Sequence, residues 1–189
     1  MKKHLTSTLL FAAMLVSAAN LTAQAQTKPA APARYADLVG DNPTAEADIQ
    51  VVTNYLNALV AGNTDQARVL MADTYRGYGP GAADSVTRDQ AMAGWQQRFK
   101  TQLARKTRLE GQTTFRVKAG RRRGTWVATW GDYLYTQNGK AMRAPFQYMA
   151  HVTKGKIDVD RTYVDNLSLY QALGYKLTPP APAATAATK

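Results

Sequence analysis

The sequence contains no cysteine and only two histidines, His4 and His151. Without cysteine the chain can form neither a disulfide nor a thiolate metal site, and so few histidines cannot build the usual transition-metal sites. The carboxylates of Asp158 and Asp160 have no further oxygen ligands at a recognisable spacing, and we interpret them as a solvated strand face. The sequence therefore predicts no metal site and no cofactor.

The chain also lacks a long hydrophobic run. The apolar stretch Leu9–Ala19 is short for a bilayer span, follows Lys2 and Lys3, and precedes the small-residue sequence Ala23-Gln24-Ala25. This order is typical of a cleavable signal peptide, which we predict over residues 1–25. The mature protein would then be secreted or periplasmic, with no transmembrane segment; an uncleaved N-terminal anchor is the alternative.

Acidic residues are scarce, with 13 Asp and Glu against 24 Lys and Arg and a net charge of +11. Ten basic residues and a single acid lie between Arg98 and Arg123, and the patch ends in Arg121, Arg122 and Arg123. Such a patch favours an anionic partner, such as an envelope component, because opposite charges attract at long range. An exported protein seldom meets nucleic acid, so no nucleic-acid partner is expected. A solvated basic face without a partner remains the alternative.

Two Pro/Ala-rich segments flank the rest of the chain. We predict a linker over residues 26–43 and a disordered tail over residues 178–189, since neither offers a hydrophobic pattern. The intervening residues 44–177 are enough for one domain and too few for two.

The first half of this domain has helical periodicity. One helix is predicted to begin near Asn42-Pro43-Thr44 and to end at Gly62, and a second, short one to follow from Asn63. Residues 75–81 contain three glycines and a proline, which indicates a loop or a short edge strand. Thr87 and Gln90 form the pattern of a capping box, which predicts the start of a third helix.

From Arg108 onward the hydrophobic period changes to two. Four strands are predicted, over residues 108–118, 125–135, 141–153 and 156–164, and a short helix over 167–174. Helices followed by an antiparallel meander indicate the α+β class, with the three helices on one face of the sheet.

The turn residues also predict the strand register. A two-residue turn at Asn138-Gly139 pairs Trp126 with His151 and places Trp130 on the same face. A three-residue loop Thr153–Gly155 would put Tyr163 and Asp165 on that face as well; a two-residue turn at Lys154-Gly155 would turn Asp165 away. The position of Gly155 favours the three-residue loop.

Three segments, Val51–Pro80, Ser85–Trp95 and His151–Gly174, resemble the SnoaL-like, polyketide cyclase-like branch of the nuclear-transport-factor-2-like superfamily. The similarity covers residues 44–175 and is a diffuse pattern without a catalytic signature. It implies a cone-shaped, curved antiparallel sheet whose concave face is covered by the three helices, with a short C-terminal helix. It also implies a pocket inside the cone and a homodimer formed through the outer sheet face.

The resemblance further implies site residues. Asp165 corresponds to the catalytic base of the cyclases and His151 to its partner, and the pocket would be lined by aromatic residues: Tyr75, Tyr78, Trp95, Trp126, Trp130 and Tyr163. Each catalytic assignment has a simpler alternative. His151 can be a packing residue stacked on Trp126, and Asp165 can be the N-cap of the helix that follows it.

Two functions follow as hypotheses. The first is an exported domain that binds a small, mostly apolar molecule. The sequence leaves open whether this domain is an enzyme; if it is one, cofactor-free acid/base chemistry of the isomerase or cyclase type is the class to test. The second is a non-catalytic, dimeric interaction module whose Arg121, Arg122 and Arg123 bind an anionic envelope component.

Overall fold

The computed structural model describes residues 33–178. The predicted signal peptide and nearly all of the predicted tail lie outside the described residues. Within residues 33–178, no helix combines the length and the hydrophobicity that a membrane crossing requires.

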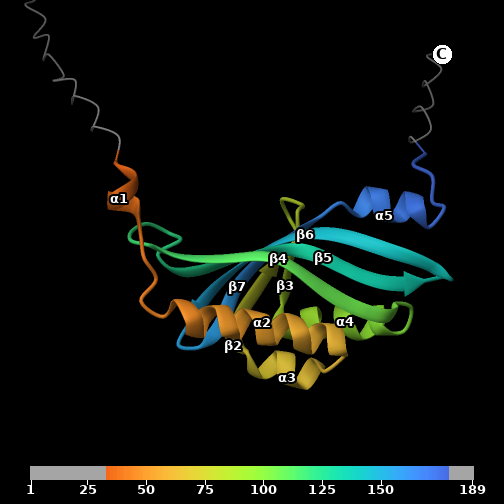
Figure 1. Ribbon diagram of the computed structural model, residues 1–189, viewed down its shortest axis with the longest axis horizontal. Coiled ribbons are helices and arrows are strands. Elements are labelled where there is room, and N and C mark those ends of the chain that lie inside the picture. Colours follow the sequence, from red (N-terminus) through yellow and green to blue (C-terminus); the bar gives the residue numbers. More distant parts are fainter. Residues whose placement is uncertain (1–32, 179–189) are drawn as a thin grey trace, which may run out of the picture. The chain divides into compact units, whose positions relative to one another are not determined.

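A curved, seven-stranded sheet forms the framework of the domain (Figure 1). The strands lie in the order β1-β4-β5-β6-β7-β2-β3. They span the following residues: β1, Val39–Gly40; β2, Met71–Tyr78; β3, Ser85–Thr87; β4, Leu103–Val117; β5, Gly124–Gln137; β6, Lys140–Thr153; and β7, Lys156–Val164. The meander from β4 to β7 is antiparallel, as the sequence predicts.

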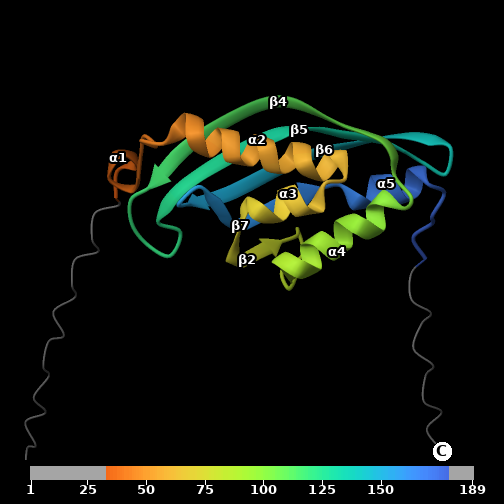
Figure 2. The ribbon, with the colours of Figure 1, turned by 90° about the horizontal axis from the view of Figure 1, so that it is seen from below.

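Three helices cover one face of this sheet: α2 (Ala45–Ala61), α3 (Thr64–Val69) and α4 (Arg88–Phe99) (Figures 1 and 2). Gly62 ends α2 in the left-handed conformation, with a φ of 84°. Asn63 caps α3 through Gln66, and Thr87 with Gln90 forms the capping box of α4. The α+β class and the three helix starts are therefore confirmed.

The hydrophobic core lies between the helices and the covered, concave face of the sheet. Val52 and Leu59 of α2 and Met92 of α4 pack there with aliphatic residues of the strands, among them Val127 and Ile157. The short helix α5 (Asn166–Ala172) packs separately at the far end of the β5–β6 hairpin, where Leu169 contacts a small cluster of buried residues.

Two features of the sheet differ from the prediction. β2 falls in the stretch interpreted as a loop or edge strand, but it pairs on both sides and runs parallel to β7, so the sheet is mixed. Residues inside the predicted linker also form structure: helix α1 (Tyr35–Leu38) leads into β1, which pairs with the edge of β4. This short strand covers backbone groups that an open edge would expose.

Candidate functional site

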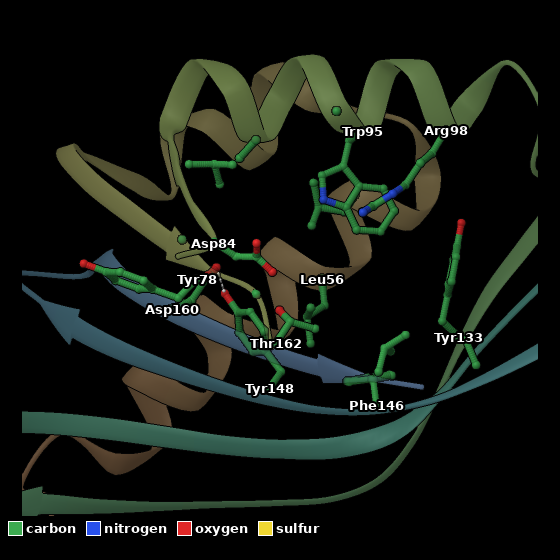
Figure 3. A pocket seen from close by; sticks show the side chains of 18 of the residues that line it. Leu56, Tyr78, Asp84, Trp95, Arg98, Tyr133, Phe146, Tyr148, Asp160 and Thr162 are labelled. Atoms are coloured by element: carbon green, nitrogen blue, oxygen red, sulfur yellow. Dashed lines mark hydrogen bonds between the residues drawn. The ribbon is translucent and has the colours of Figure 1, made fainter. Parts of the chain in front are cut away.

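A cavity of about 420 Å³ lies between the helices and the concave face of the sheet. Its walls come from α2, α4, the loop before β3 and the strands β2, β5, β6 and β7 (Figure 3). Most of its lining is apolar or aromatic, and a few polar side chains reach into it. Cavities of this size and character are where proteins bind small molecules.

The most strongly buried polar group of the cavity is the carboxylate of Asp160, on β7. Its side chain is 5% exposed. The hydroxyl of Tyr75 donates a hydrogen bond of 2.7 Å to Oδ2, and the hydroxyl of Tyr148 donates one of 2.8 Å to the same oxygen. Figure 3 shows Tyr148 and Asp160 side by side on the sheet wall of the cavity.

Strand pairing brings these three residues together. Asp160 pairs with Ala150 of β6 and with Gly77 of β2, so Tyr148 and Tyr75 lie two residues away on the neighbouring strands. Gly77 makes room for them, because a Cβ at that position would lie 2.4 Å from the Tyr75 hydroxyl and 3.1 Å from Asp160 Oδ1. A side chain at position 77 would therefore push the two groups apart.

The surroundings of Asp160 change its acidity. Burial raises the pKa of Asp160 to about 6, because the charged form loses its hydration. The hydrogen bonds from the two phenols oppose that rise, since they stabilise the carboxylate. Burial also raises the pKa of Tyr75 and of Tyr148, so both remain protonated donors at neutral pH.

Aromatic side chains form the end of the cavity that lies away from Asp160 (Figure 3). Trp95 of α4 meets Tyr133 of β5 edge to face, with ring centroids 5.8 Å apart, and Tyr133 stacks on Tyr135 at 4.9 Å. The hydroxyl of Tyr133 donates to Gln102 Oε1 at 2.9 Å. Phe146 completes this wall from β6 (Figure 3).

Two further charged side chains line the cavity. The guanidinium of Arg98 lies 4.8 Å from the ring centroid of Trp95. The carboxylate of Asp84 accepts a hydrogen bond of 3.0 Å from the backbone N–H of Gly81. Figure 3 shows Arg98 at the aromatic end and Asp84 near Tyr78, on the side of Asp160.

The architecture matches several solved structures at low sequence identity. A protein from Jannaschia sp. CCS1, named as a SnoaL-like polyketide cyclase, is 14% identical with a TM-score of 0.59, covering 73% of this chain and 99% of that one. IdmH from Streptomyces antibioticus, named as a polyketide cyclase, is 18% identical with a TM-score of 0.56, covering 68% and 99%.

A third match is a protein of ketosteroid isomerase-like fold from Catenulispora acidiphila, solved in complex with trimethylamine. It is 16% identical with a TM-score of 0.55, and the match covers 69% of this chain and 98% of that one. No protein-family model and no curated protein matches the sequence. The chain has the SnoaL-like, nuclear-transport-factor-2-like fold.

Within this SnoaL-like fold, three predicted pocket residues line the cavity. They are Tyr75 and Tyr78 on β2 and Trp95 on α4. Tyr75 has the additional role of donating to Asp160, which the sequence did not indicate.

His151 and Asp165 do not form the pair that the resemblance implies, and neither lines the cavity. His151 lies on the opposite face of the sheet, where its Nδ1 is 2.6 Å from Asp158 Oδ1 and its ring packs against Trp126 at a tilt of 48°. Asp165 is the N-cap of α5 and accepts a hydrogen bond of 3.1 Å from the backbone N–H of Ser168. The structure therefore agrees with the two simpler alternatives: His151 is a packing residue against Trp126, and Asp165 is a helix N-cap.

Trp126, Trp130 and Tyr163 also lie away from the cavity. The Nε1–H of Trp126 donates a hydrogen bond of 2.8 Å to the backbone carbonyl of Arg122. Trp130 and Tyr163 are 41% and 44% exposed. The predicted pairing of Trp126 with His151 is correct. The error concerns the face, because the helices cover the side of the sheet that carries Val127, Tyr148 and Ala150.

The choice of face also explains why Asp160 was missed, because the favoured register places Asp160 on the face opposite His151, as in the structure, and that face was interpreted as solvated. The turn at Lys154-Gly155 has two residues, both with positive φ, rather than the favoured three-residue loop. The register then shifts between Val152 and His151, so that Val159 pairs with His151 and Asp158 is the extra residue. The bulge turns Asp158 toward His151 and Asp160 toward the cavity, so the two carboxylates do not form one solvated face.

The predicted anion patch lies in the loop between β4 and β5. Arg121, Arg122 and Arg123 are all exposed. Among the ion pairs of residues 33–178, none includes these three arginines. That part of the chain also contains no group of three or more potential ligands that could hold a metal ion.

Proposed function

We propose that this chain binds a small, mostly apolar molecule in the cavity and catalyses a cofactor-free proton transfer of the isomerase or cyclase type. Asp160 is the proton acceptor. The observation that carries the proposal is a buried carboxylate in the cavity wall, hydrogen-bonded by two phenols, with a pKa of about 6.

The cavity supports binding of an apolar molecule. Its volume of about 420 Å³ suits a ligand of one to three rings, and its aromatic end offers flat surfaces that pack on such rings. The polar groups are few and lie at separate places, which favours one orientation of the ligand.

The acidity of Asp160 supports proton transfer. A base works best when its pKa lies near the working pH, and burial brings this carboxyl close to neutrality. The carboxylate would remove a proton from the carbon next to a carbonyl group and leave an enolate. Returning that proton to another carbon of the same delocalised anion completes an isomerisation. If the enolate carbon instead attacks a second carbonyl of the molecule, the proton goes to the new alkoxide and a ring is closed.

Tyr75 and Tyr148 would position the base. Both phenols donate to Oδ2, which holds the carboxylate in one orientation and leaves Oδ1 free of phenol hydrogen bonds. The names of the structural neighbours, two polyketide cyclases and a ketosteroid isomerase-like fold, support the same reaction class.

The test uses the exchange of α-protons of 1-tetralone, a small apolar ketone, in D₂O followed by proton NMR. We expect the protein to accelerate exchange and Asp160→Asn to abolish the acceleration. Asp158→Asn is the matched control: it removes a carboxylate from the same strand that faces away from the cavity, and it should leave the rate unchanged. Equal exchange by the native protein and Asp160→Asn would refute the role of Asp160.

The exposed Arg121, Arg122 and Arg123 support a second candidate, an exported, dimeric interaction module that binds an anionic envelope component. Replacing the three arginines by serine would then abolish salt-sensitive binding to phosphatidylglycerol vesicles. Sedimentation would test the dimer, and detection of a mature chain beginning after Ala25 outside the cytoplasm would test export. Vesicle binding that survives the replacement would exclude this surface.

A further inference from the structure

Arg98 is a positively charged side chain that lines the cavity. It lies in the last turn of α4, where its positive charge complements the helix dipole. Trp95 lies three residues before Arg98 on the same helix face, and this spacing directs both side chains toward the cavity. Among the ion pairs formed within residues 33–178, none involves Arg98.

The position of Arg98 is not explained by the helix dipole alone. Lys100 follows two residues later at the C-cap and supplies a positive charge at the same helix end without lining the cavity. Arg98, in contrast, lies over the Trp95 ring, beside the aromatic wall that Tyr133 provides. In Figure 3 its guanidinium lies within the cavity beside Trp95, on the side of Tyr133.

The cavity is therefore electrically polarised. Its two carboxylates, Asp84 and Asp160, lie on one side, and its arginine lies at the other end (Figure 3). A negatively charged group on a ligand is repelled by the carboxylates and attracted by Arg98, so the polarity of the cavity favours one orientation of the bound ligand. Between the two charged ends the lining is apolar and aromatic, with Leu56, Phe146 and Trp95.

We propose that the ligand is an amphipathic anion, an apolar molecule with one carboxylate, sulfonate or phosphate group. That group binds the guanidinium of Arg98, and the apolar body extends along the aromatic wall toward Asp160. This inference rests on the proposed function, since it names the class of molecule that the same cavity takes. A guanidinium that lies over an indole ring is well suited to the task, because it can offer its planar edge to an oxyanion while its face contacts the ring.

The experiment compares two fluorescent probes that differ by one sulfonate. They are the anion 1-anilinonaphthalene-8-sulfonate and its neutral counterpart N-phenyl-1-naphthylamine, each titrated into the full chain. In Arg98→Gln we expect the affinity for the anionic probe to fall by at least about fivefold, a modest loss because the arginine is partly hydrated. The affinity for the neutral probe should stay within about twofold of the native value, since it makes no charge contact.

Two variants serve as matched controls. Lys100→Gln removes one positive charge from the same helix end outside the cavity and should leave both affinities unchanged. Arg98→Lys keeps the charge but not the planar guanidinium, so its affinity for the anion should fall between those of Arg98→Gln and the native protein. An equal loss for both probes in Arg98→Gln, or no loss for either, would overturn the assignment of the anion to Arg98 while the cavity remains a ligand site.

A third variant separates this inference from the proposed function. Leu56→Trp places a large side chain in the cavity and should prevent binding of both probes. If neither probe binds the native protein, or if both bind Leu56→Trp as well as they bind the native protein, the cavity does not take such molecules. The proposed function and the assignment of Arg98 would then fail together.

Discussion

The ionisation of Asp160 should leave a measurable signature in the stability of the protein. In the folded state its pKa is about 6, against an ordinary value of 3.8. The folded protein therefore holds this proton more tightly than the unfolded chain does. The protonated carboxyl of Asp160 makes its full favourable contribution to the free energy of unfolding below about pH 4. This contribution is lost as the pH rises to about 6 and above, where the buried carboxyl must ionise.

The size of this effect follows from the difference between the two pKa values. It is about two pH units, and each pH unit is worth about 1.4 kcal/mol, so the ionisation of Asp160 costs about 3 kcal/mol. This is the net cost after the two phenol hydrogen bonds have stabilised the carboxylate. It is a large fraction of the total stability of an ordinary domain.

Urea unfolding of the native protein and of Asp160→Asn at pH 4, 5, 6 and 7 measures the effect. Asparagine has no titrating group, and the other groups are common to both proteins and cancel in the difference. We expect the free energy of unfolding of Asp160→Asn, relative to the native protein, to increase by about 2 kcal/mol between pH 4 and pH 7, the rest of the change lying below pH 4. A fixed offset from altered hydrogen bonds does not change with pH and leaves this slope intact.

Asp132 provides a control of opposite sign. The guanidinium groups of Arg143 and Arg108 hold the pKa of Asp132 below its usual range, so its stabilising contribution is present above about pH 4 and is lost as the pH falls. For Asp132→Asn the difference from the native protein should therefore be nearly constant between pH 4 and 7 and should shrink only when the titration is extended below pH 4. A flat difference for Asp160→Asn between pH 4 and 7 would refute the reasoning, because it would mean that the carboxyl is fully hydrated in the folded state.

Three further perturbations test the geometry of the site. Gly77→Ala should lower the free energy of unfolding by about 1–3 kcal/mol in urea titrations, because the new methyl group crowds the Tyr75 hydroxyl; Gly94→Ala, where a Cβ meets nothing within 4 Å, should be neutral or stabilising. Tyr148→Phe removes one donor from Asp160 and should move the rise of the α-proton exchange rate to higher pH, and an unchanged pH profile would contradict the hydrogen bond. Asp165→Ala should cost about 1 kcal/mol of stability through the loss of the α5 cap and leave the exchange rate unaltered, whereas a lost rate would return Asp165 to the site.

Local sequence signals predicted the parts of the fold that depend on neighbouring residues. Asn138-Gly139 specified the turn and with it the pairing of Trp126 with His151, and Gly62 and Thr87 marked helix boundaries. Each of these signals acts within a few residues, through left-handed backbone conformations or capping hydrogen bonds.

The location of the site depended on interactions that no local pattern contains. Which face of the sheet the helices cover is decided by packing over the whole domain, and both faces of β5 carry aromatic residues, Trp126 and Trp130 on one and Tyr133 and Tyr135 on the other. The alternation along the sequence is the same for either choice.

Asp160 illustrates the same limit. The two-residue turn and the bulge at Asp158 together give Asp160 the same facing as the predicted three-residue loop, so Asp160 was missed because the helices cover the face opposite His151. The three glycines of residues 75–81 suggested a loop, although Gly77 lies in β2, where the side chains of Tyr75 and the distant Asp160 leave no room for a Cβ. Tyr148 lies two residues from Ala150, the strand partner of Asp160, and this proximity is a signal that could have pointed to the site once the register was known.

The parallel pairing of β2 with β7 has a consequence for the order in which the protein is assembled. Tyr75 and Asp160 are 85 residues apart in the sequence, and the strands between them form a long antiparallel meander. Closing so large a loop is entropically unfavourable until the intervening strands have paired. During synthesis β2 must therefore wait, with one edge unpaired, until β7 has left the ribosome. The hydrogen bond between Tyr75 and Asp160 is then among the last to form, and a chain in which it is intact has completed its sheet.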